Sequence, residues 1–420
     1  MNYLKTFIAT AAALCCAGST AALSDPPAFP GAVGFGANAT GGRGGTIYHV
    51  TNLNDSGPGS FRDAVSEGPR ILVFDVSGYI PLTTIVTAHS NLTIAGQSAP
   101  GAGIGVQNAE VSFSHASNII CRGMRFREGT NDPIHGKSAV NIGATTNVIL
   151  DHCSFEFGKW DTIDAVHAVD FTVQNSIIAD PIGQQFGAHV ETGPGTFYRD
   201  LWVNAHNRQP LAKNDTQFIN NVVYNYNAGY TAGRTHGPHS HDIINNYFIA
   251  GPSTGKISNC FFQMGPNQSV YASGNLLSGS KSGHLDGSPL TPNNVTLVTS
   301  PWSPSTASIP VVDAATAFAT DVANDGAMPR DEVDAQVISQ VSSLGLSGAI
   351  IKSQADDGLG NDGYGILPPS TREVSPNSDG IPNDWKKAHG IDVNDPDAAS
   401  KQYGNTGYTV IETYLNSLLP

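Results

Sequence analysis

The sequence predicts a β-solenoid, a chain coiled into stacked turns that each add a short strand to a common sheet. Short segments rich in Ile, Val and Phe recur, with starts at residues 91, 118, 147, 170, 197, 217, 242 and 269. Their spacing of 20–29 residues, with one short apolar run per repeat, is typical of a solenoid. Each turn buries its apolar face only against its neighbours, so the pattern indicates one continuous core.

Turn-forming residues support the same fold class. Asparagine follows many of the segments, as at positions 220–221, 225, 245–246 and 275. Asn tolerates left-handed backbone, and its amide can hydrogen-bond along a stack of turns. The 46 Gly and 26 Pro residues favour turns over long helices. A β-sandwich and a doubly wound α/β fold are the alternatives, and poor helical periodicity between the segments disfavours the second.

Residues 1–22 have the features of a secretory signal peptide. Lys5 gives a positive start, residues 7–17 are apolar, and small residues at 19–22 offer a cleavage site. The apolar run is too short to span a bilayer, and no later segment is long and apolar enough to do so. A buried N-terminal helix is the alternative. We therefore expect a secreted, extracellular protein.

The rest of the chain divides into three predicted parts. Residues 23–300 form the solenoid, and residues 301–372 form a C-terminal segment that packs on it, with a helix-like pattern at 331–346. Residues 373–420 form a small tail with a degenerate EF-hand-like loop at 375–386. Asp379 and Gly380 fit that calcium loop, but Lys386 stands where a bidentate acid is needed. We expect this tail to dock on the solenoid without binding calcium tightly.

The net charge of −14 is unevenly distributed along the chain. Residues 23–300 contain 14 basic and 19 acidic side chains, whereas residues 301–420 contain 6 and 16. A local basic groove in the solenoid is therefore compatible with the overall acidity, but the pI of about 5.2 disfavours nucleic-acid binding. Three cysteines remain after the signal, at positions 121, 153 and 260, and we expect them to be buried rather than part of a disulfide framework.

An ordered series of motifs resembles polysaccharide lyase family 1, the pectate lyases. The matching stretches are residues 41–46, 50–64, 73–78, 91–101, 125–127, 151–154, 207–210, 220–225 and 325–334. Each stretch is weak alone, but the ordered set covers most of the mature chain. The resemblance implies a right-handed parallel β-helix. It also implies a monomeric enzyme that cleaves pectate, an acidic plant cell-wall polysaccharide, by β-elimination to unsaturated oligogalacturonides, with neither nucleic acid nor membrane as a partner.

The resemblance assigns the chemistry first to Arg208. The run Arg208-Gln-Pro-Leu-Ala-Lys213 resembles the family's Arg-x-Pro-x-x-Arg, whose first arginine is the base. An arginine base is unusual because the guanidinium is normally always protonated. Lys213 replaces an arginine that binds substrate; it keeps the charge but loses the fork that suits a carboxylate.

The resemblance also implies Ca²⁺ held by carboxylates, and the candidates are Asp132, Asp161 and Asp164. Regular strand alternation would point Asp161 and Asp164 to opposite faces, so both bind only if the chain bends there. Ser138 and Ala165 stand where relatives carry further acids, and the lysine expected near residues 182–185 has no counterpart. Weaker calcium binding is therefore expected, and methylated pectin, another uronan or a binding role without catalysis are alternatives.

Other side chains are expected around the groove. The candidates for substrate binding are Arg125, Arg127, His189, His206 and Arg234; Arg199 is a further groove cation, and Trp160 and Tyr230 could stack on sugar rings.

Three further interpretations use other residues. Asp151 and His152 are expected to be a hydrogen-bonded support inside the coil. The cluster His236, His239 and His241 is a competing zinc or general-base motif. A glycoside hydrolase would need two carboxylates flanking the cut bond, for which Asp161 and Asp164 are the candidates.

Overall fold

The computed structural model describes residues 25–131, 138–233, 237–372 and 377–419. The predicted signal peptide at 1–22, the calcium candidate Asp132, the groove candidate Arg234 and the first histidine of the competing cluster, His236, lie outside the described residues. Within the described part of the chain, no helix is long and apolar enough to cross a membrane.

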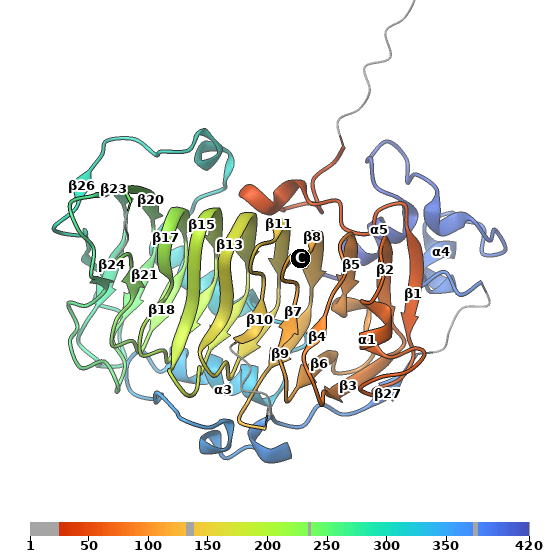
Figure 1. The fold of residues 1–420 in the computed structure, drawn as a ribbon, viewed down its shortest axis with the longest axis horizontal. Coiled ribbons are helices and arrows are strands. Elements are labelled where there is room, and N and C mark those ends of the chain that lie inside the picture. Colours follow the sequence, from red (N-terminus) through yellow and green to blue (C-terminus); the bar gives the residue numbers. More distant parts are fainter. Residues whose placement is uncertain (1–24, 132–137, 234–236, 373–376, 420) are drawn as a thin grey trace, which may run out of the picture.

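The predicted β-solenoid is confirmed, and its parallel strands stack along one axis (Figure 1). The larger sheet has the order β1-β2-β5-β8-β11-β13-β15-β17-β20-β23-β26. These strands are β1 (Thr46–Val50), β2 (Arg70–Phe74), β5 (Leu92–Ala95), β8 (Ser117–Arg122), β11 (Thr146–Asp151), β13 (Asp161–Gln174), β15 (Phe186–Tyr198), β17 (Leu211–Ile219), β20 (His239–Ile244), β23 (Gln268–Ser273) and β26 (Thr296–Leu297). All eight segments found in the sequence lie in this sheet.

A second sheet stacks alongside the first. Its parallel strands are β3 (Val76–Pro81), β6 (Ile104–Gln107), β9 (Met124–Arg127), β12 (Ser154–Glu156), β14 (Ile177–Ala179), β16 (Leu201–Val203), β18 (Val222–Tyr224), β21 (Tyr247–Ile249) and β24 (Leu276–Ser278). The antiparallel strands β25 (Ser288–Pro289) and β27 (Ser370–Thr371) pair with β24 and β3. The apolar side chains that face the interior of the coil form one long core.

A third row of strands merges with the larger sheet and carries the candidate site. The short strands β4 (Val86–Thr87), β7 (Val111–Ser112) and β10 (Ser138–Asn141) lead into the first halves of β13, β15 and β17, and β19 (Tyr230–Thr231) and β22 (Phe261–Phe262) continue the row. The three long strands therefore belong to two rows at once. We call this the front row because β4, β7 and β10 face the viewer in Figure 1.

Asparagine ladders follow the predicted stacking. Asn118 and Asn147 have φ near +61°, in the left-handed region. Inside the coil, the Asn221 amide donates to Asn246 Oδ1 at 3.1 Å, and the Asn246 amide donates to Asn275 Oδ1 at 2.9 Å. These side chains are buried, so the ladder satisfies polar groups that would otherwise be costly to bury.

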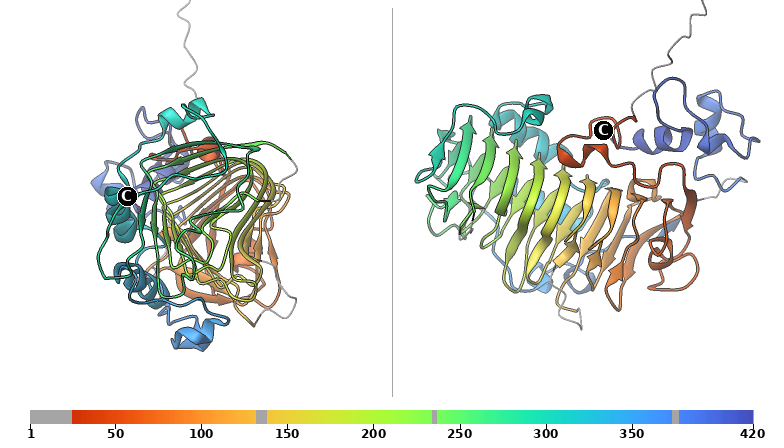
Figure 2. Two further views of the ribbon diagram at one scale, coloured as in Figure 1. Left: turned by 90° about the vertical axis from the view of Figure 1, so that its left-hand side faces the viewer. Right: turned by 45° about the horizontal axis from the view of Figure 1, so that its top comes forward.

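Helices cover part of the outside of the coil (Figure 2). A short helix, α1 (Phe61–Ala64), follows β1, while α2 (Ala314–Asn324) and α3 (Glu332–Ser342) pack on the second sheet. The helix α3 is the one expected at 331–346, and Asp331 caps it by accepting from the backbone of Asp334. It ends earlier than the pattern suggests because Leu344 and Gly345 adopt positive φ.

The tail docks on the outside of the larger sheet. Its helices α4 (Asn383–Ala388) and α5 (Val410–Asn416) carry apolar side chains onto Ile71, Val73 and Ala95. The buried Lys386 ammonium donates to Asp379 at 2.6 Å. A lysine thus supplies the positive charge that the loop's one well-placed acid needs. The three cysteines are free and buried, as expected.

Candidate active site

The front row places polar side chains from three neighbouring strands side by side. Asp164 of β13 is in register with His189 of β15, and Glu191 of β15 is in register with Lys213 of β17. Adjacent strands lie about 4.8 Å apart, so these side chains are within reach of one another. The solenoid therefore brings together residues as far apart in the sequence as Asp164 and Lys213.

Arg208 and Asp161 form an ion pair at the centre of the first group of contacts. Arg208 Nη1 donates to both carboxylate oxygens of Asp161, at 3.0 Å each. The guanidinium also lies 3.9 Å from the ring centre of Phe186, which fixes its orientation. Burial raises the pKa of Asp161 to about 7, with Arg208 opposing and Asp164 adding to that rise. Water therefore stabilises the charged form of Asp161 only weakly, and that charged form depends on a nearby cation.

A second group of contacts centres on Glu191. Its Oε1 accepts from Lys213 Nζ at 2.8 Å and lies 2.9 Å from His189 Nε2. Burial alone would raise the pKa of Glu191, but these two partners hold it below its usual value. Burial and the Arg208 charge lower the pKa of His189, so its imidazole is neutral at neutral pH. His189 Nδ1 lies 4.0 Å from Asp161 and joins the two groups.

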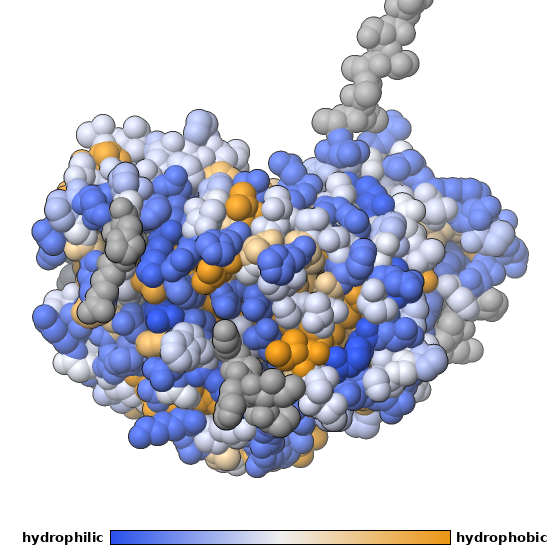
Figure 3. All heavy atoms as spheres, in the orientation of Figure 1, coloured by the Kyte–Doolittle hydropathy of each residue, from blue (hydrophilic) through white to orange (hydrophobic). Residues whose placement is uncertain are grey.

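These side chains border a surface hollow of about 330 Å³. It is lined by Trp160, Asp161, Asp164 and His189. Asp161 and Asp164 thus line the same hollow, contrary to simple strand alternation. Trp160 is 48% exposed and lies edge-on to Phe186. The surface in this view is mostly hydrophilic (Figure 3), which suits a polar polymer.

The sequence-based prediction that Arg125 and Arg127 of β9 bind substrate is wrong. Arg125 and Arg127 are fully buried and belong to the second sheet, not the front row. Arg127 donates to Glu156 at 2.9 Å and to Asp331 and Asp334 at 3.0 and 3.1 Å. Glu156 belongs to β12, but Asp331 and Asp334 come from the C-terminal segment, so both arginines hold α3 to the coil and have no access to substrate.

The remaining predicted residues divide between the site and the core. His206 is exposed and its ring stacks on Phe186, at the edge of the site. Tyr230 is fully buried and cannot stack on a sugar. His241 is also buried, with one ring nitrogen on Tyr230 and the other on Gln268, so the zinc interpretation of this histidine is wrong. Burial lowers its pKa to about 4.

Two site residues were missed by the sequence analysis. Glu191 lies two positions after His189, a spacing that puts both on one face of a strand and could have identified it. Phe186 carries no comparable signal, because an isolated aromatic residue is most often part of a core.

The candidate calcium ligands give a partial fit to a cation. Asp161 and Asp164 line one hollow, and burial leaves Asp161 dependent on positive charge. Ca²⁺ takes six to eight oxygen ligands. Among the residues that the structure describes, no three His, Cys, Asp or Glu side chains are arranged to hold a metal ion. The described side chains therefore suit a weak site that substrate or water would have to complete.

Comparisons with known proteins identify the family. No protein-family model matches the chain. It is 40% identical over 404 residues to a probable pectate lyase C of Aspergillus flavus, covering 94% of each chain. It is 38% identical over 417 residues to a probable pectate lyase C of Emericella nidulans, covering 96% of this chain and 95% of the relative.

Solved structures share the fold at low sequence identity. A pectate lyase of Acidovorax avenae subsp. citrulli superposes with a TM-score of 0.52 at 12% identity, covering 78% of this chain and 99% of that one. A pectate lyase of Bacillus sp. N165, in complex with trigalacturonate, gives a TM-score of 0.50 at 18% identity, covering 70% and 98%. On its similarity to the curated relatives over nearly its whole length, the chain belongs to the pectate lyase family, polysaccharide lyase family 1.

Proposed function

We propose that this protein cleaves polygalacturonate by β-elimination at the front row, with Arg208 as the base. The observation that carries the proposal is the convergence of two cations, Arg208 and Lys213, beside a hollow with an exposed tryptophan. Cations suit the uronate carboxylates, and an indole face suits a sugar ring. Family membership supports the same substrate class, since the relatives are named pectate lyases.

The reaction needs a base, a charge acceptor and a leaving group. The base removes the C5 proton, the C–H electron pair becomes the C4–C5 double bond, and the C4–O bond breaks. The leaving oxygen takes up a proton. Lys213 is suited to bind the uronate carboxylate, since its ammonium is partly exposed and pairs with Glu191 near the surface. Arg208, held against Phe186 and Asp161, points along the same row and must lose a proton before it can accept one.

Calcium would assist by neutralising the substrate carboxylate and making the C5 proton more acidic. Asp161 and Asp164 are the described residues that would hold it, and Asp132 is the third candidate. With so few carboxylates we expect binding to be weak and to depend on substrate. A glycoside hydrolase is less well supported, because the relatives that the chain matches over nearly its whole length are named pectate lyases.

The test follows the ultraviolet absorbance of the unsaturated product. The protein is incubated with polygalacturonate or methylated pectin, each with Ca²⁺ or with chelator. Arg208→Ala is compared with Arg372→Ala, a matched control whose side chain has the same 17% exposure and also pairs with one aspartate, Asp75. We expect absorbance to rise on polygalacturonate, to fall with chelator, and to vanish in Arg208→Ala but not in the control.

Other outcomes change the proposal in defined ways. Activity on methylated pectin that is insensitive to chelator would show that the lost carboxylates redirected the substrate. Reducing ends without absorbance would indicate a hydrolase, and no product from either polymer would leave a binding protein.

We also infer that the protein is exported and works as a monomer on an acidic polysaccharide. The signal-like features of residues 1–22 support export. Sequencing the N-terminus of protein recovered from culture medium tests it, and we expect a start close to residue 23. Retention of the protein inside the cell would contradict this inference.

A further inference from the structure

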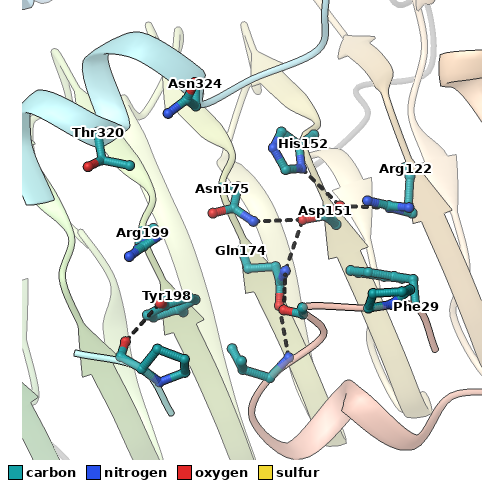
Figure 4. Close-up of a pocket in the computed structure, with 14 residues that line it drawn as sticks. Phe29, Arg122, Asp151, His152, Gln174, Asn175, Tyr198, Arg199, Thr320 and Asn324 are labelled. Carbon is teal, nitrogen blue, oxygen red and sulfur yellow. Dashed lines mark hydrogen bonds and ion pairs between the residues drawn. The ribbon is translucent and has the colours of Figure 1, made fainter. Parts of the chain in front are cut away.

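A second polar pocket lies at the opposite end of β13 from Asp161 (Figure 4). Its volume is about 300 Å³, near the lower end of the range for ligand pockets. The ends of β11, β13 and β15 form its floor, helix α2 forms one wall, and the N-terminal segment around Phe29 forms another. Three parts of the chain that are far apart in sequence therefore enclose one cavity.

The floor of this pocket is a preformed hydrogen-bond network around Asp151. The buried carboxylate accepts from Arg122 at 2.7 Å, from Asn175 at 2.8 Å and from Gln174 at 3.0 Å, and His152 Nδ1 lies 2.9 Å away. Burial opposes ionisation, but the charges of His152 and Arg122 hold the pKa of Asp151 below its usual range. Its negative charge is therefore compensated within the protein, as expected for a structural support.

Arg199, on the facing side of the pocket, has fewer hydrogen-bond partners than Asp151. Among the described residues, no group hydrogen-bonds to its buried Nε. Its guanidinium lies 5.2 Å from the ring centre of Tyr198, an aromatic rather than an acidic neighbour. None of the ion pairs found among the described residues includes Arg199, although the charges of Asp321 and Asp325 act on it from behind.

Three buried carboxyls lie behind Arg199. Asp200, Asp321 and Asp325 are buried, and neither oxygen of Asp321 has a hydrogen-bond partner among the described residues. Burial raises the pKa of Asp200, of Asp321 and of Asp325 well above the usual range, and Arg199 offsets the rise for Asp321 and Asp325 only in part. The raised pKa values reduce the negative charge that these carboxyls place behind Arg199, and the Arg199 Nε beside the pocket has no hydrogen-bond partner among the described residues.

We propose that this pocket is a second, non-catalytic binding site for a uronate, whose carboxylate pairs with Arg199. The remaining walls suit the hydroxyl groups of a sugar, since they present the Asn175 and Asn324 amides, the Thr320 hydroxyl and the Tyr198 ring. Choosing a uronate over other monoanions rests on the proposed function, because pectate and its fragments are the anions this protein would meet. The site would hold a pectate end or product while the front row works on another segment.

The test counts binding sites by calorimetry with saturated digalacturonate and chelator. In Arg208→Ala, which cannot turn the ligand over, we expect two classes of site. Adding Arg199→Gln should weaken one class at least tenfold. Thr320→Trp, which fills the pocket from the partly exposed surface of α2, should remove the same class. Lys387→Gln on α4 removes one positive charge elsewhere and should change neither.

The neutral disaccharide galactobiose and inorganic phosphate serve as competing probes. Identical isotherms with and without Arg199→Gln and Thr320→Trp would overturn the proposal. Equal binding of galactobiose at this site would also overturn it, since the charge would then play no part. Displacement by millimolar phosphate as effective as by digalacturonate would replace the uronate with a general anion site.

The same variants separate this inference from the proposed function. In protein with Arg208 intact, Arg199→Gln should leave the rate of absorbance increase on polygalacturonate within twofold. Binding that depends on Arg199 in a protein without lyase activity would support the pocket and defeat the lyase proposal. Lyase activity in a protein with a single class of binding site would support the lyase proposal and defeat the second site.

Discussion

The two basic pairs that the sequence assigned to one groove have opposite roles in the structure. Arg125 and Arg127 of β9 are fully buried and are surrounded by the acids of α3 and β12. Arg208 and Lys213 remain partly exposed, with side-chain exposures of 17% and 27%, and each pairs with a single acid. An arginine whose donors are already bonded within the chain supports the fold, whereas one with unused capacity can bind a ligand.

The difference follows from what covers each row of strands. The segment after residue 301 lays α3 and its acidic cap over the second sheet, so charges beneath it must be paired. No described helix packs on the hollow of the front row, and the two cations beside it, Arg208 and Lys213, stay partly exposed. The following substitutions test whether the charges beneath α3 act as structural pairs and whether the exposed charges of the front row act on substrate.

Removing Arg208 should produce the largest effect on catalysis. We expect Arg208→Ala to lower kcat by about 10²–10⁴-fold, the range for loss of a general base. The melting temperature should change little, because Asp161 can be protonated when its partner is lost, its pKa being already raised to about 7. Steady-state kinetics and calorimetry measure both quantities. A loss of stability with unchanged kcat would place Arg208 with the structural arginines.

Removing Arg127 should lower stability and leave catalysis unchanged. Arg127→Met leaves Glu156 buried without its cation, and leaves Asp331 and Asp334 with Arg125 as their remaining partner. We expect the free energy of unfolding to fall by about 3–5 kcal/mol, as for other broken buried ion pairs. Denaturant titration measures it, and kcat per folded molecule should not change. A change in kcat at constant stability would contradict the comparison.

Substituting Lys213 tests its role in substrate binding, with a smaller expected effect than the two substitutions above. We expect Lys213→Met to raise KM for polygalacturonate roughly tenfold with little change in kcat, since a charge-assisted contact of about 1.5 kcal/mol is lost. Lys213→Arg should lower KM, because its fork suits a carboxylate. Initial rates over a range of substrate concentrations separate the two constants. A fall in kcat alone would instead indicate a role in the chemical step.

His49 is an intermediate case with the smallest expected effect. Its hydrogen bond to Asp75, at 2.7 Å, raises the pKa of His49 despite burial. A raised pKa stabilises the fold below about pH 6.5, the value for unfolded His, and that contribution is lost as pH rises through the folded pKa. We expect the loss to be below about 1 kcal/mol because the pair is partly solvated. Melting curves from pH 5 to 8 should show this decline in the wild type and not in His49→Gln.

Much of the fold was predictable because it depends on local repetition. The eight apolar segments identified strands of one sheet, and the Asn residues after them identified the ladder at 221, 246 and 275. The motif Arg208-Gln-Pro-Leu-Ala-Lys213 also identified two cations of the front row. This was possible because the motif is one short, continuous stretch of sequence. Glu191 was accessible to the same argument, two residues after His189 on one strand.

The sequence by itself determined the repeat, the asparagine stack and the order of family motifs, because each depends on residues within one or two turns. Only the tertiary structure decided which charges are buried. Asp331 reaches Arg127 across 204 positions, and the N-terminal segment, β13 and α2 meet around Arg199 from three distant parts of the chain. Burial and pairing depend on what packs over a residue, and no local pattern in the sequence records a partner that arrives from so far along the chain.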